Sequence, residues 1–167
     1  IAGADKNFTG MCETGHNVTQ TFFAQHQLEA LHLENSLIQE LQSFAPKHTE
    51  TELRSILGCF LFTGDDVFKK IKVLSGGEKS RVALAKALTA DANFLILDEP
   101  TNHLDIASVN ILIQALKQYE GTFIVVSHDR YLLDNVANKI WFIEDQEIKE
   151  YPGTYAGYGE WSSKRVY

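Results

Sequence analysis

Two short apolar runs, at residues 94–97 and 123–126, constrain the fold of this chain more strongly than any other feature. Each run is unbroken over four residues, which is typical of a strand that is covered on both faces of a sheet. Between the runs, apolar residues at 109, 112, 113 and 116 follow the spacing of an amphipathic helix. This order predicts two parallel strands joined by a right-handed crossover helix, and therefore an α/β fold.

The chain before the first run has a helical pattern. Leucines recur every four residues from 33 to 41, and apolar residues at 53, 56, 57, 60 and 61 repeat at the helical period. Pro46 separates these two helices, because proline breaks a helix from inside. A third helix is expected after the glycines at 76 and 77.

The two ends of the chain differ from this middle. A strand is expected to end near Phe23, and residues 140–143 and 147–151 predict a hairpin. The Tyr- and Gly-rich tail after Pro152 is predicted to be irregular. We therefore divide the chain into the first part of a core at 1–27, a helical subdomain at 28–90, the rest of the core at 91–151 and a tail at 152–167.

The composition argues against several classes of protein. No run approaches the roughly 18 apolar residues of a membrane span. The net charge of −7 argues against a broad nucleic-acid-binding face, and the lysines at 69, 70 and 72 are predicted to form a solvated turn. The sequence has two cysteines, Cys12 and Cys59, without metal-binding spacing, which predicts free thiols in a reducing cytoplasm.

Polar clusters follow both apolar runs directly. Asp98 and Glu99 follow the first run, and His128 lies in a Ser-His-Asp cluster after the second. Ligands of parallel α/β sheets bind beyond the carboxyl ends of the strands, so these side chains are predicted to share a site. The aspartate could hold Mg²⁺, the glutamate could activate water, and a neutral imidazole could bind a phosphate. Alternatively, the acids cap the following turn and the histidine is structural.

A glycine pair before a predicted helix forms a second candidate site. Gly76 and Gly77 would let backbone N–H groups approach a phosphate, and the helix dipole attracts an anion. Ser75 and Glu78 also have the spacing of a capping box, which explains the same residues as an ordinary helix start. Both interpretations can hold at once. Gln25, after the strand expected to end at Phe23, could reach a metal or a water molecule.

Four segments resemble, in order and spacing, the motifs of ABC ATPases. They are the signature at 74–78, the Walker B acids at 98–100, the D-loop at 102–105 and the switch histidine at 127–129. This resemblance implies an ABC nucleotide-binding domain, with a RecA-like parallel sheet and an inserted helical signature subdomain. It also implies ATP and Mg²⁺ as cofactors.

The resemblance implies a role for each matching residue. In ABC ATPases nucleotide lies between two cassettes. The residues matching one side of the site are Asp98 for Mg²⁺, Glu99 as the catalytic glutamate, His128 as the switch histidine and Gln25 as the Q-loop glutamine, near both metal and water. The residues matching the opposite side are Ser75, Gly76, Gly77 and Glu78 of the signature and Asp105 of the D-loop.

The sequences at residues 98–105, 127–131 and 151–155 are similar to those of ABC-F proteins. This implies a cytoplasmic ATPase with two cassettes on one chain, a ribosome as partner and no direct membrane insertion. The plain Gly-Gly-Glu signature and residues 57–62 are more similar to the second cassette than to the first. Two alternatives stay open, namely the ATPase subunit of a membrane transporter and a non-enzymatic regulatory cassette, although the intact Glu99 and His128 argue against the latter.

The sequence contains no Gly-x-x-x-x-Gly-Lys-[Ser/Thr] phosphate loop. Its first residues, Ile-Ala-Gly, resemble the end of the helix that follows such a loop, so we expect the loop to lie upstream. The 167 residues alone are accordingly expected neither to hydrolyse ATP nor to bind it tightly.

Overall fold

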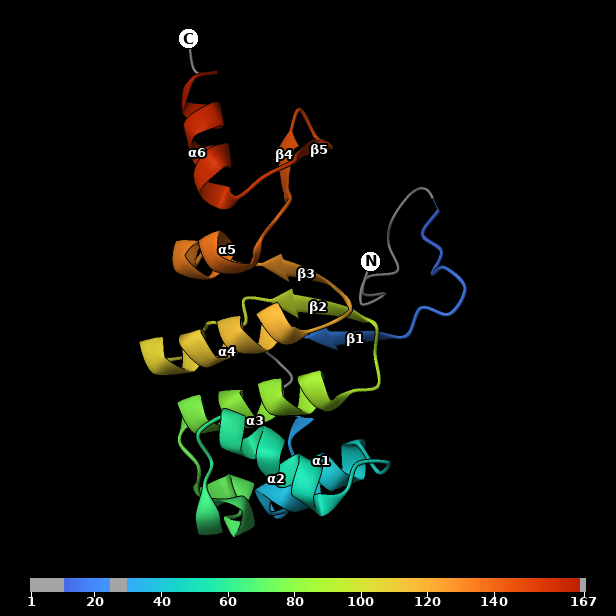
Figure 1. Ribbon diagram of the computed structural model, residues 1–167, viewed down its shortest axis with the longest axis vertical. Coiled ribbons are helices and arrows are strands. Elements are labelled where there is room, and N and C mark those ends of the chain that lie inside the picture. Colours follow the sequence, from blue (N-terminus) through green and yellow to red (C-terminus); the bar gives the residue numbers. More distant parts are fainter. Residues whose placement is uncertain (1–10, 25–29, 166–167) are drawn as a thin grey trace. The chain divides into compact units, whose positions relative to one another are not determined.

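The computed structural model describes residues 11–24 and 30–165. The chain divides into two compact units, residues 1–126 and 127–167, and each is described by itself. Figure 1 shows that the first unit contains a sheet with helices lying beside it. This arrangement confirms the predicted α/β class. The division into four segments made from the sequence stays a prediction.

The first unit contains a three-stranded parallel sheet. Its strands are β1 (Gln20–Phe23), β2 (Phe94–Asp98) and β3 (Thr122–Val126), in the order β1-β2-β3. The predicted parallel pairing of the two apolar runs is confirmed. Central β2 is buried from Leu95 to Leu97, whereas β3 is only half-buried and Val126 is 54% exposed. The prediction of a fully covered second strand was wrong, because within the described residues β3 pairs with β2 alone and lies at the edge of the sheet.

Short helices precede the sheet strand β2. They are α1 (Leu37–Phe44), α2 (Glu50–Cys59), the 3-10 helices η2 (Gly64–Phe68) and η3 (Ile71–Val73), and α3 (Gly76–Thr89). Each of the three α-helices begins with a capping box, as the sequence predicts for the third. Leu33 was predicted to belong to the first helix but precedes it and is half exposed. Helix α3 packs against α1, α2, β1 and α4 (Ile106–Gln118), which joins β2 to β3.

The second unit contains α5 (Arg130–Val136), β4 (Ile140–Glu144), β5 (Glu147–Tyr151) and α6 (Tyr155–Ser163). The predicted antiparallel hairpin is confirmed. The irregular tail is not, because α6 occupies most of it. Thr154 caps this helix by accepting a hydrogen bond from the Gly157 amide at 3.3 Å.

Aromatic packing explains why the tail is helical. The Phe142 ring of β4 lies 5.1 Å from the Tyr158 ring and 5.5 Å from the Trp161 ring of α6. Packing of these half-buried rings against the hairpin offsets the low helix propensity of the two glycines in α6. Sequence periodicity alone does not show this, because the partner rings belong to a different element.

Other predictions from composition are also tested. Cys12 and Cys59 are free, as predicted, and both are exposed. The lysine cluster is neutralised within the chain, since Lys70 and Lys72 both contact Glu34, at 3.0 and 2.9 Å, and Lys69 pairs with an aspartate. No helix in the described parts of the chain is long and apolar enough to cross a membrane.

Candidate functional site

The carboxyl ends of the three parallel strands lie at one edge of the sheet. Phe23 of β1 pairs with Leu97 of β2, and Asp98 pairs with Val126 of β3, so the strands end at the same level. Leu97 is fully buried, whereas the next residue, Asp98, is exposed. The apolar strand therefore presents its terminal carboxylate at the edge where ligands of such sheets bind.

Glu99 turns sharply away from the strand. Its φ angle is 47°, in the left-handed region, and its N–H donates to the Val126 carbonyl at 2.8 Å. A non-glycine residue in this conformation costs about 1–2 kcal/mol. Such strain is most often found at functional sites, where the surrounding structure holds it. Glu99 is half-buried at this turn, whereas Asp98 is exposed.

The segment after Glu99 is a compact turn that leads into α4. The Leu104 N–H donates to the Thr101 carbonyl at 3.0 Å, and His103 has a φ angle of 65°. Asp105 caps α4 by accepting a hydrogen bond from the Ser108 amide at 2.8 Å. Hydrogen bonds from Ser108, and then the positive charge of Arg81, hold the pKa of Asp105 below its ordinary value.

The signature residues start α3, and their capping box is present. The Glu78 N–H donates to the Ser75 hydroxyl oxygen at 3.3 Å, while the Ser75 N–H and hydroxyl donate to the Glu78 carboxylate at 2.8 and 2.7 Å. These bonds from Ser75, and then the nearby cations Arg81 and Lys69, hold the pKa of Glu78 below its ordinary value. First-turn amides of a helix have no partner inside it, so those of Gly76 and Gly77 suit an anion.

The two signature glycines have different surroundings. A Cβ atom at Gly76 would meet nothing within 4 Å, but one at Gly77 would lie 3.1 Å from the backbone oxygen of His103. The start of α3 and the turn at 102–105 are therefore in close contact. This contact was not predicted from the sequence, although a glycine pair signals close backbone approach as well as phosphate binding.

Two predicted site residues are not placed relative to the strand ends and the turn described above. His128 is exposed and belongs to the second unit, where Asp129 begins α5 by accepting the Leu132 amide at 3.1 Å. Gln25 lies outside the described residues. The roles of both residues stay predictions.

The carboxylates at the sheet edge suit a metal that arrives with a nucleotide. In the described residues no group of three or more His, Cys, Asp or Glu side chains could form a metal cage. Magnesium bound to nucleotide needs only one or two protein carboxylates, since phosphates and water supply its other ligands. The exposed Asp98 therefore fits such an ion.

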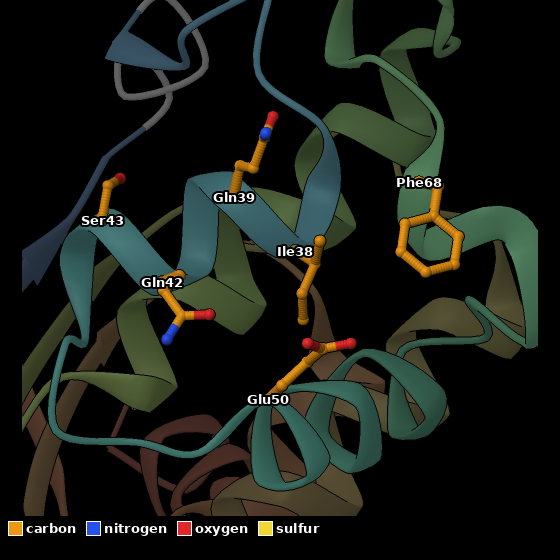
Figure 2. A pocket seen from close by; sticks show the side chains of 6 residues that line it. All are labelled: Ile38, Gln39, Gln42, Ser43, Glu50 and Phe68. Carbon is orange, nitrogen blue, oxygen red and sulfur yellow. The ribbon is translucent and has the colours of Figure 1, made fainter.

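A hollow elsewhere in the first unit does not involve these residues. Its volume is about 450 Å³, and Figure 2 shows that its lining comes from α1, the start of α2 and the end of η2. The residues that line it are Ile38, Gln39, Gln42, Ser43, Glu50 and Phe68. It offers an acid and amides rather than cations, so it does not suit a phosphate.

Comparison with known proteins decides the family. A protein-family profile described as "ABC transporter" matches residues 5–102. The chain is 40% identical over 165 residues to "Probable ATP-binding protein YheS" of Haemophilus influenzae, and 38% identical over 161 residues to "ABC transporter F family member 5" of Arabidopsis thaliana. The chain belongs to the ABC-F branch of the ABC transporter family. The match to the first relative covers 99% of this chain and 26% of that protein. The match to the second covers 96% of this chain and 23% of that protein.

Two further similarities concern ribosome-related proteins. The chain is 58% identical over 92 residues to "Ribosome protection protein VmlR" of Bacillus subtilis, which covers 55% of the chain and 17% of that protein. A crystal structure of archaeal ribosomal stalk protein aP1 with archaeal ribosome recycling factor aABCE1 matches with a TM-score of 0.72 and 26% identity. That match covers 98% of this chain and 33% of the other, and supports the ABC nucleotide-binding fold.

Proposed function

We propose that this chain is an ATP-hydrolysing cassette of a longer cytoplasmic ABC-F protein that acts on the ribosome. The observation that carries the proposal is the end of β2. There an exposed Asp98 is followed by a Glu99 held at φ 47° by its bond to Val126. Two adjacent carboxylates in different surroundings can serve a metal and a water molecule separately, which suits hydrolysis of the phosphoanhydride bond of ATP.

We assign the proposed roles to residues that follow the carboxyl ends of the strands. Asp98 binds the Mg²⁺ of Mg-ATP, which neutralises phosphate charge, and Glu99 orients and deprotonates the attacking water. His128 binds the γ-phosphate, and Gln25 contacts the metal or the water. These residues share one nucleotide, bound between this cassette and a second one.

The signature serves the nucleotide on the other side of the cassette pair. The first-turn amides of Gly76 and Gly77 contact its phosphates, because a helix N-terminus attracts an anion. Ser75, Glu78 and Asp105 complete this face. Their capping bonds already fix the starts of α3 and α4, so the face is organised before nucleotide arrives.

A ribosomal target is supported by the relatives rather than by the site. VmlR is described as a ribosome protection protein, and aABCE1 as a ribosome recycling factor. The acidic chain, with net charge −7, and the internally paired lysine cluster offer little attraction for RNA phosphates. In the proposed function this cassette supplies ATP-driven movement, while other parts of the longer protein contact ribosomal RNA.

The Glu99→Gln variant of the full-length protein tests the proposal. Glutamine keeps the size of the side chain but removes the base, so steady-state phosphate release should fall about 10²–10⁴-fold. Mg-ATP should still bind, since Asp98 is unchanged. The ATP-bound protein should then remain on ribosomes and co-sediment with them when ATP is present.

Glu120→Gln is the matched control, because Glu120 is an exposed acid between α4 and the amino end of β3, whereas the candidate site lies at the carboxyl ends of the strands. It should leave phosphate release and co-sedimentation unchanged. Wild-type turnover in Glu99→Gln would remove Glu99 from catalysis. Abolished turnover without ATP-dependent ribosome association would keep the ATPase and reject the ribosomal target.

A further inference from the structure

The turn before α1 lies alongside the segment that leads into the signature. The Lys72 N–H donates to the Leu33 carbonyl at 3.0 Å. Ser36 and Lys70 form an antiparallel bridge, so the two segments run in opposite directions. Residues 33–36 are therefore joined through their backbone to residues 70–72, which are distant in sequence.

Glu34 adds two ion pairs to this backbone pairing. Its carboxylate lies 3.0 Å from the ammonium nitrogen of Lys70 and 2.9 Å from that of Lys72. Hydrogen bonds from Lys72, and then from Lys70, hold the pKa of Glu34 below its ordinary value, so the acid is charged at neutral pH. An isolated exposed ion pair contributes little to stability. Here, however, one acid bridges two cations on a segment that backbone bonds already hold in place.

The paired segment ends directly before the signature. Ile71 is fully buried, and its N–H donates to the Asn35 carbonyl at 3.0 Å. The Ile71 carbonyl in turn accepts the Leu74 N–H at 3.1 Å. Ser75, which caps α3, is the next residue. The position of the signature start therefore depends on how firmly residues 70–72 are held.

The same turn reaches α3 at a second point. The Asn35 amide donates to the buried Glu40 carboxylate at 2.9 Å, and that carboxylate pairs with Lys86 in the last turn of α3. The turn is thus fixed to the far end of the helix, while Glu34 joins it to the segment that precedes the helix start.

We infer that Glu34 is a positioning residue, which through Lys70 and Lys72 holds the segment before the signature and so fixes the start of α3. The inference rests on the proposed function, in which this helix start faces the nucleotide of the opposite site. Glu34 lies outside the signature and acts on it only through the paired segments.

Hydrogen exchange of two amides in the full-length protein tests this role. The Lys72 amide is bonded to Leu33 in the paired segments, and the Glu78 amide is bonded to the Ser75 hydroxyl at the start of α3. Glu34→Gln keeps the size of the side chain but removes its charge, so exchange of both amides should quicken about two- to fivefold. At about 1 M salt, where exposed charges are screened, wild type and Glu34→Gln should exchange alike.

Turnover provides the functional measurement. The kcat for ATP should fall in Glu34→Gln by a factor similar to that of the exchange, while KM stays the same, because Glu34 binds no part of the nucleotide in the proposed function.

Reversal of the charges shows whether Glu34 acts through the two lysines. Glu34→Lys places three cations together and should quicken exchange more than Glu34→Gln does. Adding Lys70→Glu and Lys72→Glu to Glu34→Lys should return exchange and kcat toward wild type, because opposite charges then face each other again. Asp91→Asn is the control, since it breaks an exposed ion pair of 3.0 Å with Lys47 that involves neither paired segment. It should change neither amide.

Four results would overturn the inference: unchanged Lys72 exchange in Glu34→Gln, faster Lys72 exchange without faster Glu78 exchange, no rescue by charge reversal, or wild-type kcat in Glu34→Gln. A wild-type protein without ATPase activity would instead reject the proposed function. Exchange of the Glu78 amide would still decide in that case whether Glu34 fixes the start of α3.

Discussion

The carboxylate of Glu40 accepts a hydrogen bond of 2.6 Å from the ammonium group of Lys86, and Glu40 is fully buried. The pair joins α1 to α3, the helix that begins with the signature residues. The Asn35 amide donates to the same carboxylate at 2.9 Å, and Nδ1 of His32 lies 3.1 Å from it. A charge in the interior is thus satisfied by groups from two segments, which orients α3 on its neighbours.

Removing the cation of this pair should destabilise the helical part strongly. Lys86→Met leaves a buried carboxylate without its cation, a change that costs about 3 kcal/mol or more. The expected result is a loss of that size in the free energy of opening of the α1 and α3 amides, measured by hydrogen exchange.

Two variants control for this result. Glu40→Gln should cost less than Lys86→Met, because Lys86 is 19% exposed and can turn toward water. Lys47→Met breaks an ion pair of similar length, at 3.0 Å to Asp91, in which both side chains are 83% exposed. It should cause no measurable change, since exposed pairs contribute little. Equal losses in Lys86→Met and Lys47→Met would show that burial does not strengthen the Glu40 pair.

The same pair predicts a pH dependence. Burial raises the pKa of Glu40, but hydrogen bonds from Lys86, Asn35 and His32 and the charge of Lys86 outweigh it, so the pKa lies below the ordinary value of 4.5. A lowered carboxyl pKa contributes stability above pH 4.5, and this contribution is lost as the pH falls through the folded-state pKa.

Lys86→Met should change the sign of this dependence. Without the cation, burial dominates and the pKa of Glu40 should rise above 4.5, so protonation then favours the folded state. The stability difference between wild type and Lys86→Met should therefore shrink as the pH falls, first above pH 4.5 where Glu40 of the variant takes up its proton, and then below it where the wild type loses stability. Hydrogen exchange or urea unfolding would measure this difference. A constant difference would show that Glu40 does not titrate as described.

The burial of Glu40 also marks a limit of sequence-based prediction. The leucines around it correctly predicted a helix, because apolar spacing reports one face of one element. The same spacing says nothing about Glu40, which the structure shows to be buried. Its partner Lys86 lies 46 residues away, so only tertiary packing shows that the two charges meet in the interior.

The hairpin turn of the second unit gives a prediction in the stabilising direction. Asp145 and Gln146 have φ angles of 55° and 65°, which a two-residue type I′ turn requires. Asp-Gly suits this turn, whereas glutamine is strained in it. Gln146→Gly should therefore stabilise the hairpin by about 1 kcal/mol, seen as slower exchange of the β4 and β5 amides. Gln146→Val should do the opposite, because a branched Cβ clashes at positive φ. If glycine speeds exchange instead, the turn is not strained at residue 146.

The turn also shows why element ends were harder to predict than elements. The sequence predicted three connecting residues, but β4 continues through Glu144, directly opposite Glu147. Two like charges in register would disfavour this pairing. Lys149 at 2.7 Å and Arg165 at 3.3 Å neutralise Glu144, and Arg165 is distant in sequence.

The candidate site, too, was predictable from the sequence only in part. From the sequence, the acids at the strand ends had two interpretations, a ligand site or caps of the following turn, and their roles stay predictions. The left-handed backbone of Glu99 and the contact between Gly77 and His103 were not predicted, because both depend on segments that are not adjacent in sequence. The sequence therefore predicts candidate residues for the site but not the backbone contacts around them.

The last prediction separates the two interpretations of Ser75, as a helix cap and as part of a nucleotide-facing surface. Ser75→Ala and Ser75→Arg both remove the side-chain oxygen that accepts the Glu78 amide. Both should therefore destabilise the first turn of α3 by about 1 kcal/mol. Arginine also places a bulky cation next to Gly76, where the surroundings are open and a phosphate of the opposite nucleotide would approach. Only Ser75→Arg should block ATP-dependent closure of the full-length protein, measured by fluorescence energy transfer between labels on its two cassettes. Equal loss of closure in both variants would mean that Ser75 acts through helix capping alone, and normal closure in Ser75→Arg would remove the signature from the nucleotide-facing surface.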